Sequence, residues 1–184
     1  YWDSRYVDSV VLAFMFLGGV NFSILYNLAH GKFKQAYKNE VLKWYVLICL
    51  LGTVICFADL YFRGENRNVL DCAIDSLFHI TATISTTGYS VENYSWGQFS
   101  LMILIILMIS CACAGSTSGG LKIDRMVVLF KNVKNEFSKA IHPNLVTTVR
   151  MNGKVVPYAH VQRTVAFLVI FTLILVASTT IITM

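Results

Sequence analysis

The sequence predicts an all-α integral membrane protein with four membrane spans and one short helix that enters the membrane without crossing it. Of its 184 residues, 56% are hydrophobic and 14% are charged, which is too apolar for a soluble domain of this length. The chain also contains apolar stretches that approach or reach the roughly 20 residues a helix needs to cross a bilayer. These stretches are 7–29, 41–62, 99–114 and 165–184.

Basic residues are segregated along the chain, which sets the expected orientation of the spans. Twelve of the 15 lysines and arginines lie in the connections after the first and third apolar stretches. They are Lys32, Lys34, Lys38, Lys43, Lys122, Arg125, Lys131, Lys134, Lys139, Arg150, Lys154 and Arg163. Because cytoplasmic loops accumulate lysine and arginine, both connections are expected in the cytoplasm, opposite Arg5, Arg63 and Arg67. The net charge of +5 therefore indicates topology in a lipid bilayer and not a nucleic-acid partner.

The first two stretches are expected to be complete spans. The first, 7–29, contains Gly18, Gly19 and Asn21 near its middle. Small residues permit close approach of another helix, and an amide inside a membrane needs a partner on another segment, so this helix should pack against protein. The second, 41–62, carries aromatic residues near both ends, as spans do at the two membrane interfaces.

The connection between the second and third stretches, residues 68–96, is too apolar for an ordinary loop. Its apolar residues recur at three- and four-residue spacing, which predicts an amphipathic helix of about 15 residues. Asn68 is the expected N-cap, and Asp71 lies in the first turn, where a carboxylate suits the helix dipole. A hydroxyl-rich stretch then leads to Gly88. A short helix followed by such a segment predicts a re-entrant pore loop.

The third stretch, 99–114, is followed by glycine and hydroxyl residues before Lys122 is reached. They are Gly115, Ser116, Thr117, Ser118, Gly119 and Gly120. Helices end at such clusters, and non-helical backbone at membrane depth is tolerated only beside protein or a water-filled cavity. We therefore expect a broken third span whose end lines water, followed by an amphipathic helix over 121–138 near the inner surface.

The expected function depends on five residues after the short helix: Ser85, Thr86, Thr87, Gly88 and Tyr89. A cation that leaves water must replace its hydration shell, and a ring of backbone carbonyls can do so without fixed charge. Gly88 supplies dihedral freedom, whereas the β-branched Thr86 and Thr87 favour an extended backbone. The string Thr-Thr-Gly-Tyr resembles the Thr-Val-Gly-Tyr core of potassium channel filters.

Three stretches together resemble the TrkH subfamily of the Trk/Ktr/HKT potassium transporters, and they occur in the family's order. They are 15–22, 84–90 and 114–122. The resemblance implies helix–pore loop–helix repeats of the potassium-channel type, four of them around one central pore, each supplying one filter segment. It also implies that Gly115 to Gly120 form an intramembrane gating loop beneath the filter. Potassium is then the transported ion, held at the filter residues, and no covalently bound cofactor is expected.

The same resemblance divides the chain into parts of successive repeats. Residues 1–29 close a preceding repeat, 30–40 form a cytoplasmic connection, 41–138 form a complete repeat with a cytoplasmic helical extension, 139–163 form a second cytoplasmic connection, and 164–184 open the next repeat. The implied partners are the remaining repeats of the same transporter, a second copy in a homodimer, and a cytosolic nucleotide-binding regulatory subunit. The implied location is the bacterial cytoplasmic (inner) membrane, in a multi-pass arrangement.

Two other classes of function are alternatives. A membrane-embedded hydrolase using Ser116 or Ser118 would need a histidine base within hydrogen-bond reach, and the histidines fall in cytoplasmic connections or, for His79, on the outer side. A non-conducting structural membrane protein would not explain a re-entrant loop with this string. The residues thus favour transport over enzymatic activity.

Several features also have plainer readings. The glycine-rich run could be a flexible helix C-terminus. It is not a phosphate-binding loop, because Leu121 intrudes before Lys122. His79 is expected to be a packed or solvated helix residue, with proton sensing as a lesser option. Asp71 and Asp75 either partner the helix dipole or attract cations to the outer mouth.

Overall fold

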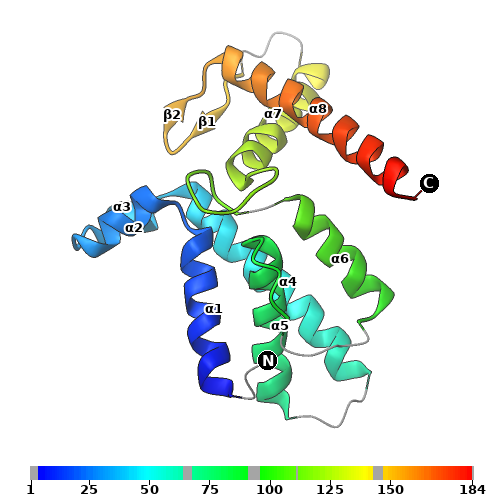
Figure 1. Cartoon of the computed structure of the whole chain (residues 1–184). Helices are drawn as coiled ribbons and strands as arrows, with labels where there is room; N and C mark the ends of the chain where they lie inside the picture. The colour runs from blue at the N-terminus through cyan, green and yellow to red at the C-terminus, as the bar shows by residue number, and fades with distance from the viewer. Residues whose placement is uncertain (1–3, 64–67, 91–95, 111, 143–146, 184) are drawn as a thin grey trace. The chain divides into compact units, whose positions relative to one another are not determined.

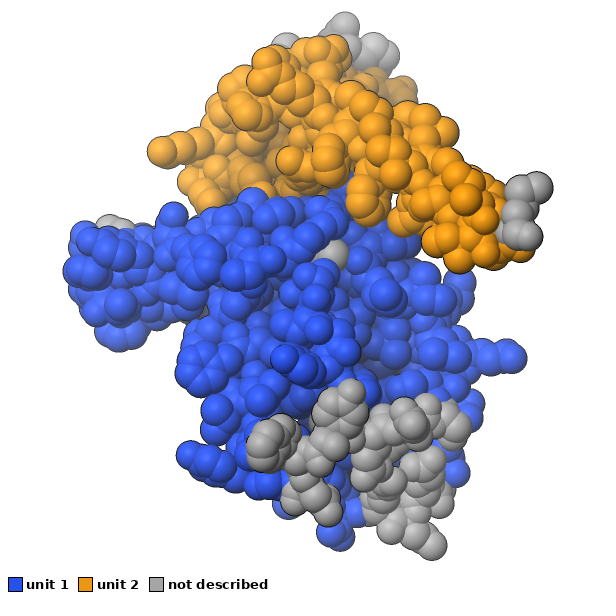
Figure 2. Space-filling model, viewed as in Figure 1, with its two compact units in different colours: residues 1–123 blue, residues 124–184 orange. Residues whose placement is uncertain are grey.

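A computed structural model describes residues 4–63, 68–90, 96–110, 112–142 and 147–183. The chain divides into two compact units, Tyr1–Ile123 and Asp124–Met184 (Figure 2). The described elements, in chain order (Figure 1), are α1 (Arg5–Gly19), α2 (Phe22–Ala29), α3 (Phe33–Tyr37), α4 (Glu40–Phe62), α5 (Val69–Ile84), α6 (Gln98–Ile109), α7 (Ile123–Ile141), β1 (Arg150–Met151), β2 (Lys154–Val155) and α8 (Tyr158–Thr183).

The short helix α5 forms the centre of the first unit. It contacts α1, α4 and α6 (Figure 1), and most of its residues from Cys72 to Ile84 are buried. Ile80 and Ile84 are fully enclosed, as is Tyr45 of α4. The predicted amphipathic helix is therefore confirmed. Asn68 is the N-cap by position, but its side chain donates to the Asp71 carboxylate, 3.3 Å away, and makes no capping bond.

The first apolar stretch is not one continuous span, so that prediction is wrong. The axes of α1 and α2 differ by 111°. Val20 and Asn21 have extended backbones, and the Asn21 side chain accepts from the Ser23 N–H at 2.7 Å, which starts a new helix. Among the described residues, α4 and α8 are long and apolar enough to cross a membrane, and α1 with α2 adds a third candidate only if the bent pair counts as one span. The described residues thus contain two or three candidate spans, whereas the sequence predicted four.

The helix of the third apolar stretch ends before the glycine cluster, and it ends earlier than predicted. Helix α6 has 12 residues and stops at Ile109, with Ser110 as its C-cap. The predicted apolar span extended to residue 114. In the structure, Ala112 to Gly115 lie outside α6 and form hydrogen bonds with other segments. The irregular segment reaches Lys122, where α7 follows.

The second unit contains α7, a hairpin and α8. Strands β1 and β2 pair antiparallel, with Arg150 opposite Val155. Asn152 and Gly153 have φ values of 50° and 77°, the conformation of a two-residue hairpin turn. Val128, Val149 and Val161 pack together beside this hairpin. The connection over 139–163 is therefore partly structured, which the sequence analysis missed.

Candidate functional site

The end of α5 has the geometry of a Schellman motif, in which a left-handed residue closes the helix. Ser85 is the C-cap, the Thr86 N–H donates to the Thr83 carbonyl at 3.2 Å, and the Thr87 N–H donates to the Ala82 carbonyl at 3.1 Å. Thr86 has φ = 59°, a conformation that costs a β-branched residue about 1–2 kcal/mol. The expected extended backbone at Thr86 is thus wrong, because helix closure requires the left-handed conformation there.

Residues 85–89, hereafter the hydroxyl loop, pass from the protein interior to its surface. Ser85 is 3% exposed, whereas Thr86, Thr87, Gly88 and Tyr89 are exposed. Gly88 has φ = 70°, and a side chain added there would meet no atom within 4 Å. Glycine is therefore required at this position for its dihedral freedom and not for space.

Side chains of the hydroxyl loop attach it to α1. The Thr87 hydroxyl lies 2.9 Å from the Met15 sulfur and 3.1 Å from the Ser85 hydroxyl. Met15 is itself buried beside Phe78 and Ala82 of α5. An open pocket beside this region is lined by Ala82, Thr83, Thr86, Gly88 and Met108. The loop thus has one side fixed to helices and another side open.

Residues 115–120, hereafter the glycine loop, follow a segment that is bonded to the end of α1. The Cys113 N–H donates to the Gly19 carbonyl at 3.2 Å. The Thr117 N–H and hydroxyl both donate to the Gly18 carbonyl, at 3.2 and 3.1 Å. The last carbonyls of a helix lack partners within it, so these bonds satisfy groups that the break in α1 and α2 leaves open.

The start of α2 completes this junction. The Phe22 N–H donates to the Gly115 carbonyl at 3.0 Å, and the Asn21 side-chain amide donates to the Ala114 carbonyl. Gly115 has φ = 73°. The expected partner of Asn21 on another segment is thereby confirmed. Two helix breaks far apart in sequence satisfy each other's backbone, which is what permits irregular backbone in an apolar region.

The glycine loop also contacts the hydroxyl loop. The Gly119 N–H donates to the Thr86 hydroxyl at 3.2 Å. Ser116 donates to the Cys113 carbonyl at 2.6 Å, and the Ser116 and Ser118 hydroxyls lie 2.8 Å apart. These bonds contradict the reading of a free, flexible helix C-terminus. They also place both serines in a structural role, which gives the hydrolase alternative no support.

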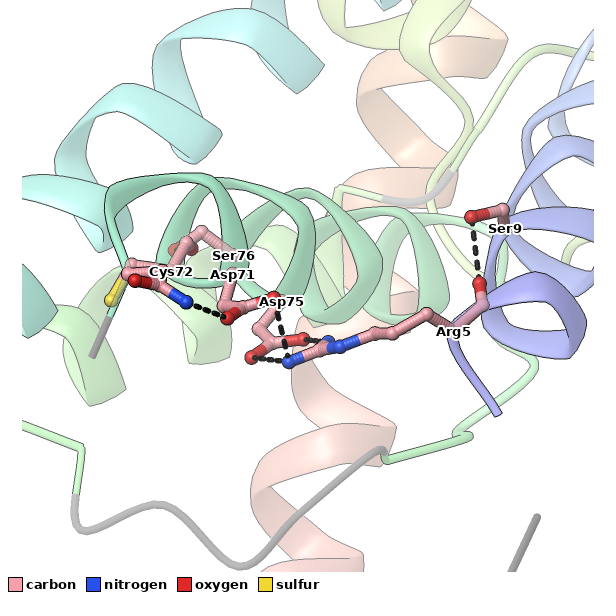
Figure 3. Close-up of polar contacts among 7 residues, drawn as sticks. Arg5, Ser9, Asp71, Cys72, Asp75 and Ser76 are labelled. Carbon is pink, nitrogen blue, oxygen red and sulfur yellow. Dashed lines mark hydrogen bonds and ion pairs between the residues drawn. The ribbon is translucent and has the colours of Figure 1, made fainter. Parts of the chain in front are cut away.

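Arg5 joins α1 to the first turns of α5, a contact that the sequence analysis did not anticipate (Figure 3). Its guanidinium lies 3.2 Å from an Asp71 carboxylate oxygen and pairs with both oxygens of Asp75. The Asp75 side chain is 1% exposed and that of Asp71 is 34% exposed. The sequence signal for this contact was a pair of carboxylates one helical turn apart in α5, together with an arginine at the start of α1. Their pairing with Arg5 favours a structural role over attraction of free cations.

Two further contacts lie near the start of α6. The Asp59 carboxylate of α4 accepts from the Gly97 N–H at 2.9 Å and from Arg63 at 3.2 Å, which fixes the start of α6. His79 is buried, and its ring centroid lies 5.0 Å from that of Trp96 in an edge-on arrangement. His79 is therefore a packed helix residue, which agrees with the prediction of a packed or solvated residue at this position.

The fold and this site define a membrane protein in which two helix breaks meet beside the buried short helix α5 and its exposed loop. Residues 1–184 match the family model for "TrkH: Cation transport protein", so the chain belongs to the TrkH family. This confirms the resemblance drawn from the three stretches of sequence. The family is one of transporters and not a known class of enzyme.

Named relatives agree with this family. TrkH of Salmonella typhimurium, a "Trk system potassium uptake protein", is 26% identical over 180 residues, which cover 97% of this chain and 37% of that protein. TrkG of Escherichia coli K12 is 26% identical over 175 residues, covering 94% and 36%. An uncharacterized cation transporter of Methanocaldococcus jannaschii is 32% identical over 136 residues, covering 73% and 26%.

The fold matches a solved structure. The crystal structure of the potassium transporter TrkH from Vibrio parahaemolyticus superposes with a TM-score of 0.89 at 24% identity, covering 96% of this chain and 39% of that one. This similarity supports the fold. The chain thus spans less than two-fifths of the length of these relatives.

Proposed function

We propose that this chain forms part of the wall of a potassium-conducting pore. The backbone carbonyls of Ser85, Thr86, Thr87, Gly88 and Tyr89 supply one of four filter segments, and the glycine loop controls passage beneath it. The observation that carries this proposal is the end of α5, where a buried helix delivers an exposed loop with left-handed residues at Thr86 and Gly88. The names of the relatives support potassium as the ion.

Electrostatics favour a cation at the hydroxyl loop. The C-terminal end of a helix carries about half a negative charge, and α5 ends directly at Ser85. Backbone carbonyls can replace the hydration shell of potassium without a fixed charge. Potassium is then cargo, and the chemistry needs no covalent step.

The remaining walls come from other parts of the same transporter, because one filter segment cannot enclose an ion. In this proposal, residues 1–29 close one repeat, 41–138 form a complete repeat, and 164–184 open the next, with cytoplasmic connections at 30–40 and 139–163. A homodimer in the bacterial inner membrane, with a cytosolic nucleotide-binding regulatory subunit, completes the assembly.

Gly88→Ser in the intact transporter tests the filter. A serine at φ = 70° is strained and should shift the backbone, so we expect the ratio of potassium to sodium flux in proteoliposomes to fall. Gly31→Ser is a matched control, since Gly31 has φ = 73° and equally open surroundings outside the hydroxyl loop. If Gly88→Ser keeps the wild-type ion preference, the filter assignment is wrong.

Removal of the glycine loop tests its role as a gate. Deleting residues 115–120 should raise potassium flux if this segment obstructs the pore. Because Gly115 and Thr117 bond to α2 and α1, the deletion also removes structural contacts, so the variant must first elute as an assembled transporter in gel filtration. Lower or unaltered flux in such an assembled variant would count against the gate.

A further inference from the structure

We infer that Thr86 is a positioning residue whose hydroxyl holds the tip of the glycine loop against the hydroxyl loop. This inference rests on the proposed function and deepens it, since it names the contact that keeps the gate closed beneath the filter. The contact is the hydrogen bond from the Gly119 N–H to the Thr86 Oγ1, 3.2 Å long.

The glycine loop consists of an anchored part and a tip. The anchored part, Gly115 to Thr117, is bonded to Phe22 and Gly18, and the preceding Ala114 carbonyl accepts from the Asn21 amide. The tip, Gly119 and Gly120, is exposed, and a side chain added at Gly119 would meet no atom within 4 Å. Movement that opens a passage therefore requires the least rearrangement at the tip, where the bond to Thr86 lies.

The conformation of Thr86 supports the same role. It holds the left-handed position that closes α5, where glycine would be unstrained. Glycine offers no hydroxyl, whereas threonine supplies the acceptor that the Gly119 N–H uses. The strained threonine thus provides a contact that the unstrained residue cannot provide, and strain of this kind is characteristic of functional loops.

The bond links two parts of the proposed pore. If the tip moves away, the bond breaks, and if the backbone at Thr86 changes, the acceptor moves. A ligand or partner that displaces the anchored segment therefore acts on the tip against this bond. Loss of one hydrogen bond of this type should shift the closed–open equilibrium about two- to tenfold.

Thr86→Val and Thr86→Ser in the intact transporter test the inference. Valine keeps the β-branched shape and removes the acceptor, so potassium flux into proteoliposomes should rise about two- to tenfold. Serine keeps the acceptor, so the flux of Thr86→Ser should lie below that of Thr86→Val. Thr83→Val is the matched control, because the Thr83 hydroxyl donates to the His79 carbonyl within α5, at 2.7 Å.

The outcomes separate this inference from the proposed function. Wild-type flux in Thr86→Val, or equal flux in the valine and serine variants, overturns the positioning role while the filter proposal stands. An unchanged preference for potassium over sodium in Gly88→Ser, in contrast, would refute the filter assignment.

Hydrogen exchange gives a second readout if Thr86→Val fails to assemble. In Thr86→Ala, deuterium uptake at the Gly119 amide should be about two- to tenfold faster than in the wild type or in Thr86→Ser. Uptake at the amides of Cys113 and Thr117, which bond to α1, should not change. Equal uptake at Gly119 in the three proteins would overturn the inference.

Discussion

Tyr45 lies fully buried in α4 and donates its hydroxyl proton to the Phe16 carbonyl of α1 at 3.1 Å. The two rings also pack together, with centroids 5.1 Å apart. This arrangement requires glycine at position 19, since a side chain there would lie 2.3 Å from the Tyr45 hydroxyl. A single absent methyl group therefore decides how closely α1 approaches α4.

Gly19→Ala should destabilise the transporter by about 1–3 kcal/mol, because the added methyl overpacks the site beside Tyr45. Thermal unfolding of the detergent-solubilised protein, followed by fluorescence, would measure this as a lower midpoint. Gly18→Ala is the matched control, since its added methyl meets the Thr117 hydroxyl at an ordinary 3.4 Å. Equal midpoints for the two variants would contradict the packing argument.

Arg5 and Asp75 form an ion pair that is buried on the aspartate side. Arg5→Gln removes the arginine charge beside the buried Asp75 carboxylate and should cost about 2–3 kcal/mol, below the usual range for a buried pair because water reaches Arg5. The double variant with Asp75→Asn should lose less than the sum of the single variants, which a double-mutant cycle on thermal midpoints would measure. Asp71→Asn, at a more exposed carboxylate, should cost under about 1 kcal/mol. Strict additivity would argue against the pair.

At the scale of elements, the main feature is the junction of two helix breaks. The end of α1 offers carbonyls, the start of α2 offers N–H groups, and residues 112–117 supply partners for both. Neither break would be stable alone in an apolar region, because each would leave backbone groups unsatisfied. The position of the glycine loop is therefore set by α1 and α2 as much as by α6.

Asn21→Asp separates the two roles of Asn21 at this junction. Aspartate can still accept from the Ser23 N–H and cap α2, but it cannot donate to the Ala114 carbonyl. We expect faster hydrogen exchange in residues 112–117 with little change within α2. Asn21→Ala should also loosen the start of α2, at a further cost of about 1 kcal/mol. Unchanged exchange over 112–117 in both variants would refute the junction.

At the scale of the whole molecule, the charge distribution predicts which end of each helix faces the cytoplasm. Lys38 and Leu70 are both exposed and are predicted to lie on opposite sides of the membrane. Single cysteines at these two positions in a cysteine-free transporter would test the predicted topology. A membrane-impermeant maleimide should label Leu70→Cys in intact cells and Lys38→Cys only after permeabilisation. The reverse labelling would invert the topology.

Much of the element order could be predicted because its signals are local. Apolar length predicted α4, three- and four-residue spacing predicted α5, and the glycine and hydroxyl clusters marked both loops. The hairpin at Asn152 and Gly153 was also local but was overlooked, since the basic residues around it suggested only a connection. The sequence therefore contained the signal for the hairpin of the second unit, although the hairpin was not predicted.

The features that the sequence did not predict depend on contacts between residues far apart in the chain. The break at Asn21 lies within an apolar run and is stable only because Ala114 and Gly115 accept its hydrogen bonds. Likewise, the left-handed Thr86 contradicts its β-branched preference, because closing α5 requires it. Sequence alone determined that this is a helical membrane protein with a short amphipathic helix between apolar stretches, and it marked the hydroxyl loop and the glycine loop. Tertiary structure decided where the helices break and which groups join the loops, since backbone groups in an apolar region take whichever partners the fold brings to them.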